Sequence, residues 1–192
     1  MGIGKRVESE TILRREFPKK CQFYGADPDP NPNKALFEGI NGTYFGSAIG
    51  AKTEVKQAFL LTNNGYKPYT IPHVALEEFV SNIVGRNDVV DWMSIDIEGG
   101  EIDLFPSLLK GGLFDRLDMD ICQLNMELHL EPNTDGSPSD GDVAIYNFVR
   151  DALVSNRFVF LKVTYPYKNR VTHYGINVES PRCRQRYMSS LV

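Results

Sequence analysis

The chain has 192 residues, of which 42% are hydrophobic, and its formal net charge is -4. This length fits one domain that buries about 70% of the surface its unfolded form exposes. The moderate charge excludes proteins that bind nucleic acids or anionic membranes through a strongly basic surface, and it favours small or neutral ligands. No apolar stretch reaches the roughly 18 to 20 residues that a membrane span needs, and the opening residues lack the pattern of a signal peptide.

The cysteines give no sign of a metal site. Cys21, Cys122 and Cys183 are widely spaced and contain no CxxC pair. An odd number of cysteines cannot form a complete disulfide framework, and the spacing does not match zinc-binding motifs. We therefore expect three free thiols.

Strand-like and helix-like hydrophobic patterns alternate along the chain, which is typical of an α/β protein with an open sheet. At the start, the pattern predicts a helix over residues 7–17 and a strand over 21–26. Residues 27–32 form a turn, because proline fixes φ and the Asp and Asn side chains can cap the next helix. That helix holds residues 35–40, and a strand over 43–49 follows it.

The middle of the chain carries the strongest pattern. Residues 55–61 predict an added strand or an irregular insertion, and residues 74–84 predict a helix that ends near Gly85. Residues 89–97 are apolar enough for a buried parallel strand. A short glycine turn then leads into a helix that runs through Leu108.

The last third predicts a strand, a polar loop, a helix and two antiparallel strands that close the sheet. These elements cover residues 121–130, 131–140, 143–155, 158–165 and 171–178. Asp140 or Asp142 can cap the helix. Because the residues from Arg182 onward are polar, we expect a frayed tail.

Two glycines and one acid near the start have the spacing of a nucleoside site. Gly2 and Gly4 precede the first predicted helix, and Asp27 follows the next predicted strand. Glycines at such a turn let the backbone approach a ligand, and an acid about 20 residues further on accepts hydrogen bonds from ribose hydroxyls. Asp27 also fits a simple turn residue before Pro28. Both interpretations stay open from the spacing alone.

Asp96 and Glu98 end the predicted buried strand, at the edge where ligands bind in open α/β sheets. Residues two apart in a strand face the same side, so both carboxylates could point into one cleft. Neighbouring like charges raise one pKa, which suits a general base, and the pair could hold a divalent cation. Alternatively, Glu98 and Glu101 cap the following helix, and we favour that role for Glu101.

Glu127 and His129 repeat this arrangement at the end of the next strand. His129 could take a proton from a substrate hydroxyl, or it could form a hydrogen bond to a loop carbonyl, which is the favoured reading. His73 and His173 lack such a setting, and we expect them to be structural or exposed.

Several segments, in order along most of the chain, resemble the FkbM-like methyltransferases, a family of S-adenosylmethionine-dependent enzymes. The most specific segment is DWMSIDIEGGEIDLF, and the others are GADPDP, SAIGAKTEV, VALEEFV and NMELH. The resemblance implies a class I Rossmann-like sheet that is mostly parallel with an antiparallel C-terminal hairpin. It also implies a methyltransferase domain over residues 1–180, followed by a polar tail over 181–192.

The resemblance implies methyl transfer from S-adenosylmethionine to a hydroxyl oxygen of a small-molecule, glycan or lipid acceptor. Asp27 would bind the ribose, and Asp96 would lie near the sulfonium and the acceptor. The residues expected to contact the cofactor are Gly2, Gly4, Asp27, Ile49 and Asp96. The residues expected to be catalytic are Asp96, Glu98 and His129.

Two departures from the family pattern favour an alternative function. Ser94 stands where the family often has lysine, and the strand expected before Gly2 is missing, so the first central strand of the sheet would be absent. A non-catalytic protein that keeps the fold as a cofactor-binding or interaction module is therefore the second hypothesis. A third, weaker hypothesis takes Asp96, Glu98 and Glu127 as the divalent-metal cluster of a hydrolase. The chain reads as cytoplasmic, unless a signal or anchor was lost with the first strand.

Overall fold

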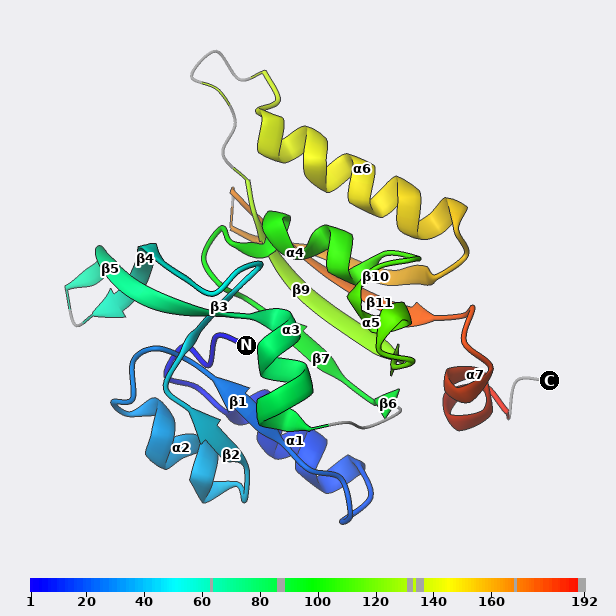
Figure 1. The fold of residues 1–192 in the computed structure, drawn as a ribbon, viewed down its shortest axis with the longest axis horizontal. Coiled ribbons are helices and arrows are strands. Elements are labelled where there is room, and N and C mark those ends of the chain that lie inside the picture. The colour runs from blue at the N-terminus through cyan, green and yellow to red at the C-terminus, as the bar shows by residue number, and fades with distance from the viewer. Residues whose placement is uncertain (63, 86–88, 131–132, 134–136, 168, 190–192) are drawn as a thin grey trace. The chain divides into compact units, whose positions relative to one another are not determined.

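A computed structural model describes residues 1–62, 64–85, 89–130, 133, 137–167 and 169–189. The structure mixes helices and strands, which confirms the predicted α/β class (Figure 1). The chain divides into two compact units, Met1–Val84 and Gly85–Val192, and each is described by itself. Among the helices in the described residues, none is long and apolar enough to cross a membrane.

The first unit begins with helix α1 (Glu8–Glu16), strand β1 (Tyr24–Ala26), helix α2 (Asn33–Gly39) and strand β2 (Thr43–Phe45). β1 and β2 are parallel, with Tyr24 opposite Thr43. Phe37 of α2 is buried against this pair. A Cβ at Gly25 or Gly42 would overlap the Phe37 ring, so glycine at these two positions allows α2 to pack closely.

A second sheet in this unit has the order β3-β5-β4. It contains β3 (Ala48–Gly50), β4 (Glu54–Thr62) and β5 (Gly65–Ala75), with β3 parallel and β4 antiparallel to β5. The single strand predicted over residues 43–49 is therefore wrong, because β2 and β3 belong to different sheets. The predicted helix over 74–84 starts only at α3 (Leu76–Glu78) and continues as the π-helix η1 (Phe79–Val84).

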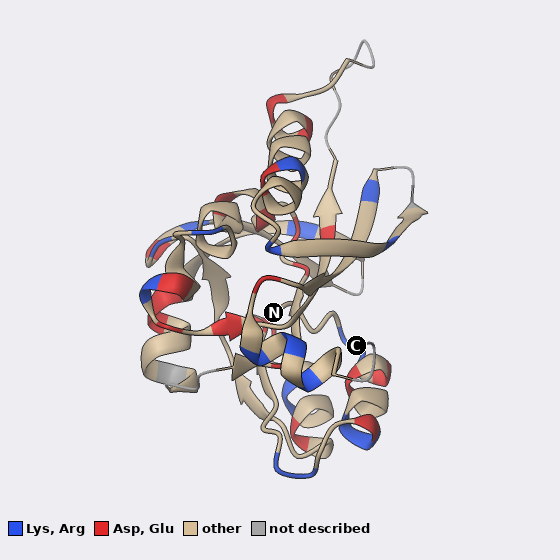
Figure 2. Cartoon of the chain, turned by 90° about the vertical axis from the view of Figure 1, so that its right-hand side faces the viewer, with Lys and Arg blue, Asp and Glu red and all other residues tan. Residues whose placement is uncertain are grey.

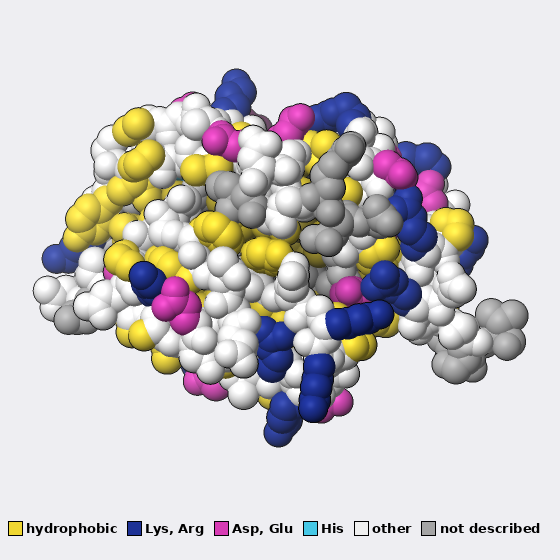
Figure 3. Space-filling model, turned by 60° about the horizontal axis from the view of Figure 1, so that its bottom comes forward, with side chains coloured by type: hydrophobic (Ala, Val, Ile, Leu, Met, Phe, Trp, Pro, Cys, Tyr) yellow, Lys and Arg dark blue, Asp and Glu magenta, His cyan; other side chains and the backbone are white. Residues whose placement is uncertain are grey.

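The β4–β5 hairpin exposes a set of large apolar side chains, namely Val55, Phe59, Tyr66 and Tyr69. In Figure 3, hydrophobic atoms gather at the left, the side on which this hairpin projects in Figure 1. Pro68 and Pro72 lie in the part of β5 that pairs with β4 but not with β3, which reaches only residues 73–75. Proline cannot donate a ladder hydrogen bond, so it limits further pairing along an open strand edge.

The main sheet of the second unit has the order β10-β11-β9-β7. β7 (Met93–Ile95) is parallel to β9 (Gln123–His129), and β11 (Arg170–Asn177) is antiparallel to both β9 and β10 (Phe158–Tyr167). The predicted C-terminal antiparallel hairpin is thus confirmed. A separate parallel pair joins β6 (Val89–Val90) to β8 (Asp120–Ile121).

The strand pairings in the described part of the chain form four small sheets, of which two are parallel pairs and two contain both directions. The predicted strand over residues 89–97 is split, because β6 and β7 belong to different sheets. The mixed α/β content is consistent with the family fold, whereas the single class I sheet stays a prediction.

Three helices of the second unit are α4 (Glu101–Leu108), α5 (Leu113–Arg116) and α6 (Asp140–Val154). Phe105 of α4 stacks on Phe148 of α6 with ring centroids 4.2 Å apart. The N-cap of α6 is Ser139, whose hydroxyl accepts a hydrogen bond from the Asp142 N–H, while the Asp142 carboxylate accepts one from the Ser139 N–H. This capping box corrects the expected caps, since Asp140 lies inside the helix.

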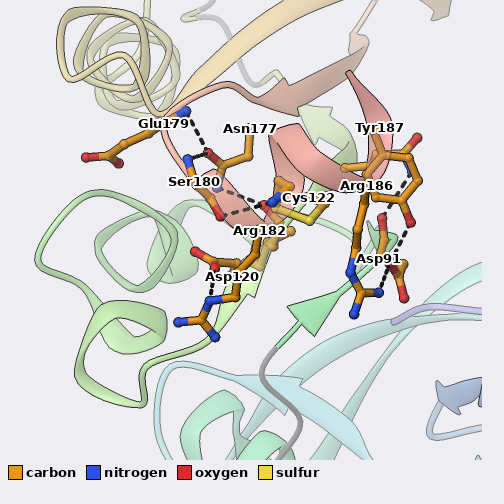
Figure 4. The surroundings of a disulfide bond; sticks show 12 residues. Asp91, Asp120, Cys122, Asn177, Glu179, Ser180, Arg182, Arg186 and Tyr187 are labelled. Carbon is orange, nitrogen blue, oxygen red and sulfur yellow. Dashed lines mark hydrogen bonds and ion pairs between the residues drawn. A yellow bond between two sulfur atoms is a disulfide. The ribbon is translucent and has the colours of Figure 1, made fainter. Parts of the chain in front are cut away.

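Cys122 and Cys183 form a disulfide, which corrects the prediction of three free thiols (Figure 4). Cys21 is the free cysteine. The disulfide ties the start of β9 to helix α7 (Pro181–Tyr187), which covers residues from Arg182 onward that we expected to be frayed. The spacing of 61 residues explains why the sequence does not reveal this pair.

Polar contacts also hold α7 in place (Figure 4). Arg182 forms ion pairs with Asp118 and Asp120. Arg186 and Tyr187 both donate hydrogen bonds to Asp91, which lies just before β7. The adjacent Trp92 stacks on Tyr174 of β11, with ring centroids 5.4 Å apart.

We expect the folded protein to lose stability in mild acid because of the buried side chain of His173. It is buried on β11 with its ring edge-on to Phe160, and burial lowers its pKa. The unfolded chain therefore binds the proton more readily, so stability is present above the unfolded pKa of about 6.5 and falls as pH drops below it. Urea midpoints at pH 7.5 and 5.5 test this, since His173→Gln should show a smaller decrease than the wild type. Equal decreases would contradict the prediction.

Candidate functional site

The structure brings Gly2, Gly4 and Asp27 together in the first unit. Gly2 and Gly4 have φ angles of 75° and 62°, the left-handed region that glycine adopts without strain. The N–H groups of Ile3 and Gly4 donate to Asp27 Oδ2 over 2.8 and 3.3 Å. The N–H of Asp29 donates to Asp27 Oδ1 over 2.9 Å.

These bonds give Asp27 a definite structural role. Its carboxylate closes a turn through Asp29 and holds the glycine loop, and the residue is 8% exposed. The turn-residue interpretation is therefore confirmed. A carboxylate has about four acceptor positions, and three hydrogen bonds occupy most of them. Ribose binding by Asp27 stays a prediction.

Tyr44 of β2 supports the same turn. Its hydroxyl donates a hydrogen bond of 2.5 Å to the backbone oxygen of Asp27. Burial, together with the charges of Asp27 and Asp29, raises the pKa of Tyr44 to about 12, so the phenol stays protonated as a donor. Ile49 lies in β3 with its side chain buried, and its predicted contact with a cofactor is likewise untested.

The other predicted residues meet in the second unit. Asp96 and Glu98 follow β7, and His129 ends β9, which runs parallel to β7. Because the carboxyl ends of parallel strands lie at the same sheet edge, the three side chains come together. One ligand-type atom from each lies within 4.8 Å of the other two.

Ion pairs link these side chains to their neighbours. His129 Nε2 lies 3.1 Å from Glu98 Oε2, and His129 Nδ1 lies 3.3 Å from Glu101 Oε1. By distance these are ion pairs, although neither ring nitrogen reaches hydrogen-bond geometry with a described residue. Arg170 pairs with Glu127 at 2.8 Å and with Glu98 at 3.4 Å. His129 therefore contacts carboxylates, and the favoured contact with a loop carbonyl is not among the hydrogen bonds of the described residues.

The cluster shifts two pKa values. Burial, followed by the charges of Glu127 and Glu98, raises the pKa of Asp96 to about 7, against a lowering effect of His129. Burial would lower the pKa of His129, but contacts with Glu101 and Glu98 outweigh it and raise the pKa to about 10. In this arrangement His129 is protonated at neutral pH, whereas Asp96 exchanges its proton near neutrality.

Glu101 fixes the loop that carries Glu98. Glu98 and Gly99 have φ angles of 56° and 99°, so the chain turns sharply there. The Glu101 carboxylate accepts hydrogen bonds from the N–H groups of Ile97 and Gly99, over 2.7 and 2.9 Å. The residue is 1% exposed. Glu101 thus holds the turn before α4 and pairs with His129, whereas the expected side-chain cap of the helix is not among the hydrogen bonds of the described residues.

Arg170 is a site residue that the sequence analysis missed. It lies opposite His129 in the register between β11 and β9. This register depends on the hairpin geometry, so only a correct pairing of residues 123–129 with 170–176 could have revealed it. Figure 2 shows that basic residues (blue) and acidic residues (red) are interspersed along the described part of the chain.

A family model described as the methyltransferase FkbM domain matches residues 7–160. The chain belongs to the FkbM methyltransferase family. The match includes Asp27, Ile49 and the cluster of Asp96, Glu98 and His129, and FkbM family membership indicates methyltransferase activity. Gly2, Gly4 and helix α7 lie outside the matched range. No curated protein and no solved structure matches the chain significantly.

Proposed function

We propose that this FkbM-family chain is an S-adenosylmethionine-dependent methyltransferase that methylates a hydroxyl oxygen of a small-molecule, glycan or lipid acceptor. The observation that carries the proposal is the cluster of Asp96, Glu98 and His129 at the carboxyl ends of two parallel strands, within the family match. Ligands in open α/β folds bind at this edge.

S-adenosylmethionine supplies an electrophilic methyl group when it is bound. The carboxylates of Asp96 and Glu98 are placed to accept the proton of the acceptor hydroxyl as its oxygen attacks. The His129 ring, between Glu98 and Glu101, orients Glu98 and is a positioning group in this scheme. Most of the acceleration comes from proximity and orientation, so no covalent nucleophile is required.

Cofactor binding is tested by calorimetric titration of S-adenosylmethionine into the full chain. Asp27→Ala should weaken binding at least about tenfold, because it removes the acceptor that holds the Gly2–Gly4 loop and contacts the ribose. Glu38→Ala removes the same charge from the exposed side of α2 and should bind like the wild type. Absence of binding by the wild type, or equal binding by both variants, would contradict the proposal.

A non-catalytic module is the second candidate, because described backbone groups already occupy most of the acceptor positions of Asp27. A measurement of methyl transfer distinguishes an enzyme from a non-catalytic module. If the chain is an enzyme, Glu98→Gln, which changes a predicted catalytic carboxylate outside the predicted cofactor contacts, should lower methyl transfer about 100-fold while S-adenosylmethionine still binds. Absence of transfer to acceptors of all three classes, with or without saturable cofactor binding, would favour the module.

The disulfide gives information on the cellular compartment in which the protein folds. Buried disulfides form and persist in oxidising compartments, and are rare in the cytosol. Cys122 and Cys183 are both buried. This pair favours a protein that folds in an oxidising compartment over the cytoplasmic reading of the sequence. Non-reducing peptide mapping of the protein from its own cells tests the pairing, and an unlinked Cys183 peptide would support the cytoplasm.

A further inference from the structure

Asp96, Glu98 and His129 each place an atom that can bind a metal ion, a carboxylate oxygen or an imidazole nitrogen, close to the other two. One oxygen or nitrogen from each residue lies within 4.8 Å of the other two. Atoms bound at about 2.1 Å to one ion lie about 3 Å apart when adjacent and about 4.2 Å apart when opposite. The 3.1 Å between His129 Nε2 and Glu98 Oε2 fits the adjacent arrangement.

Buried polar atoms of the cluster lack well-formed hydrogen bonds among the described residues. The His129 side chain is only 10% exposed, and its ring nitrogens lie 3.1 and 3.3 Å from carboxylate oxygens of Glu98 and Glu101, but outside hydrogen-bond geometry. Asp96 Oδ1 is also shielded from solvent and has no hydrogen-bond partner in the described part of the chain. Buried polar atoms in this condition are uncommon, and a bound ion is one established explanation for them.

The charges of the cluster favour a cation. Among the described residues, Arg170 and the protonated His129 are the basic groups paired with the surrounding carboxylates. These carboxylates belong to Asp96, Glu98, Glu101 and Glu127. When all groups are ionised, negative charges exceed positive charges, and a dication would reduce this excess. Such an ion would take the place of the proton on His129 Nε2, which faces Glu98, while the Nδ1 proton would stay directed at Glu101.

We propose that Asp96, Glu98 and His129 form a binding site for a first-row divalent cation of the Mn²⁺ type. Two carboxylates with one imidazole suit such an ion, whereas Mg²⁺ and Ca²⁺ prefer ligand sets made of oxygen alone. In methyl transfer the ion would hold the acceptor oxygen, and the second carboxylate oxygen of Asp96 or Glu98 would accept its proton; that role rests on the proposed function. The binding itself does not.

Electron paramagnetic resonance of Mn²⁺ titrated into the tag-free, oxidised full chain tests the site without any methyl donor or acceptor. We expect one Mn²⁺ to bind per chain, seen as a loss of the free-ion signal. Asp96→Asn and Glu98→Gln should each weaken this binding at least about tenfold. Asp103→Asn removes a charge from the exposed side of α4 and should leave it unchanged.

The isosteric Asp96→Asn variant decides the outcome, provided that its circular dichroism matches that of the wild type. Failure of the wild type to bind Mn²⁺ at millimolar concentration would overturn the site, as would equal affinities for Asp96→Asn and Asp103→Asn. Mn²⁺ binding by a chain that does not bind S-adenosylmethionine would support the site while contradicting the proposed function.

Discussion

Glu101→Ala should lower the free energy of unfolding by about 2–4 kcal/mol, because it leaves buried polar and charged groups without their partner. The carboxylate accepts hydrogen bonds from the N–H groups of Ile97 and Gly99 and pairs with His129. Glu101 is 1% exposed, so water cannot readily replace these contacts. Urea unfolding of the oxidised protein measures the loss.

Two variants make this measurement specific. Glu101→Gln keeps one acceptor oxygen and should lose less stability than Glu101→Ala. Asp103→Ala changes an exposed acid on the same helix and should stay within about 0.5 kcal/mol of the wild type. If Glu101→Ala and Asp103→Ala lost equal stability, the structural role of the buried carboxylate would be wrong.

Cys183→Ser should lower the free energy of unfolding by about 4 kcal/mol, since the disulfide closes a long loop in the unfolded chain. Cys122 and Cys183 are 61 residues apart in sequence, and both are buried. The measurement is chemical unfolding under non-reducing conditions. Reduction of the wild type with a dithiol should bring its stability close to that of the variant.

The free cysteine provides the matched control. Cys21→Ser changes a partly exposed thiol outside the disulfide, so its stability should remain within about 0.5 kcal/mol of the wild type. Thiol titration of the unfolded, oxidised wild type should detect one thiol, that of Cys21. Detection of three thiols would show that Cys122 and Cys183 are not linked.

Four helices were the most predictable part of the fold. α1, α2, α4 and α6 all lie at or close to their predicted positions, because each has apolar residues at helical spacing and a recognisable start or end. The hairpin of β10 and β11 was also predicted correctly. Each of these elements follows from a local hydrophobic pattern and turn signals that lie within about 20 residues of sequence.

The strand boundaries depended on distant contacts. Residues 89–97 form one apolar run, yet Asp91 interrupts it and accepts hydrogen bonds from Arg186 and Tyr187 of α7. No pattern near Asp91 indicates these partners. β5 was missed for a different reason, since Pro68 and Pro72 are typical of turns and are tolerated in strands chiefly along an open edge.

The site was predictable to the level of strand ends. The sequence analysis identified Asp96, Glu98 and His129, and the structure places them together because β7 and β9 are parallel neighbours. It could not identify Arg170, whose position depends on the register of β11. Nor could it show that Asp27 holds the loop of Gly2 and Gly4 through its carboxylate, because those bonds depend on the folded backbone.

The stack of Trp92 on Tyr174 provides an optical signal for the second unit. Trp92 is the only tryptophan in the chain, so fluorescence excited at a wavelength that tyrosine does not absorb reports on this position alone. It is adjacent to Asp91, which Arg186 and Tyr187 hold from α7. A change in emission wavelength during unfolding or reduction would therefore follow the release of this helix, with no dye attached.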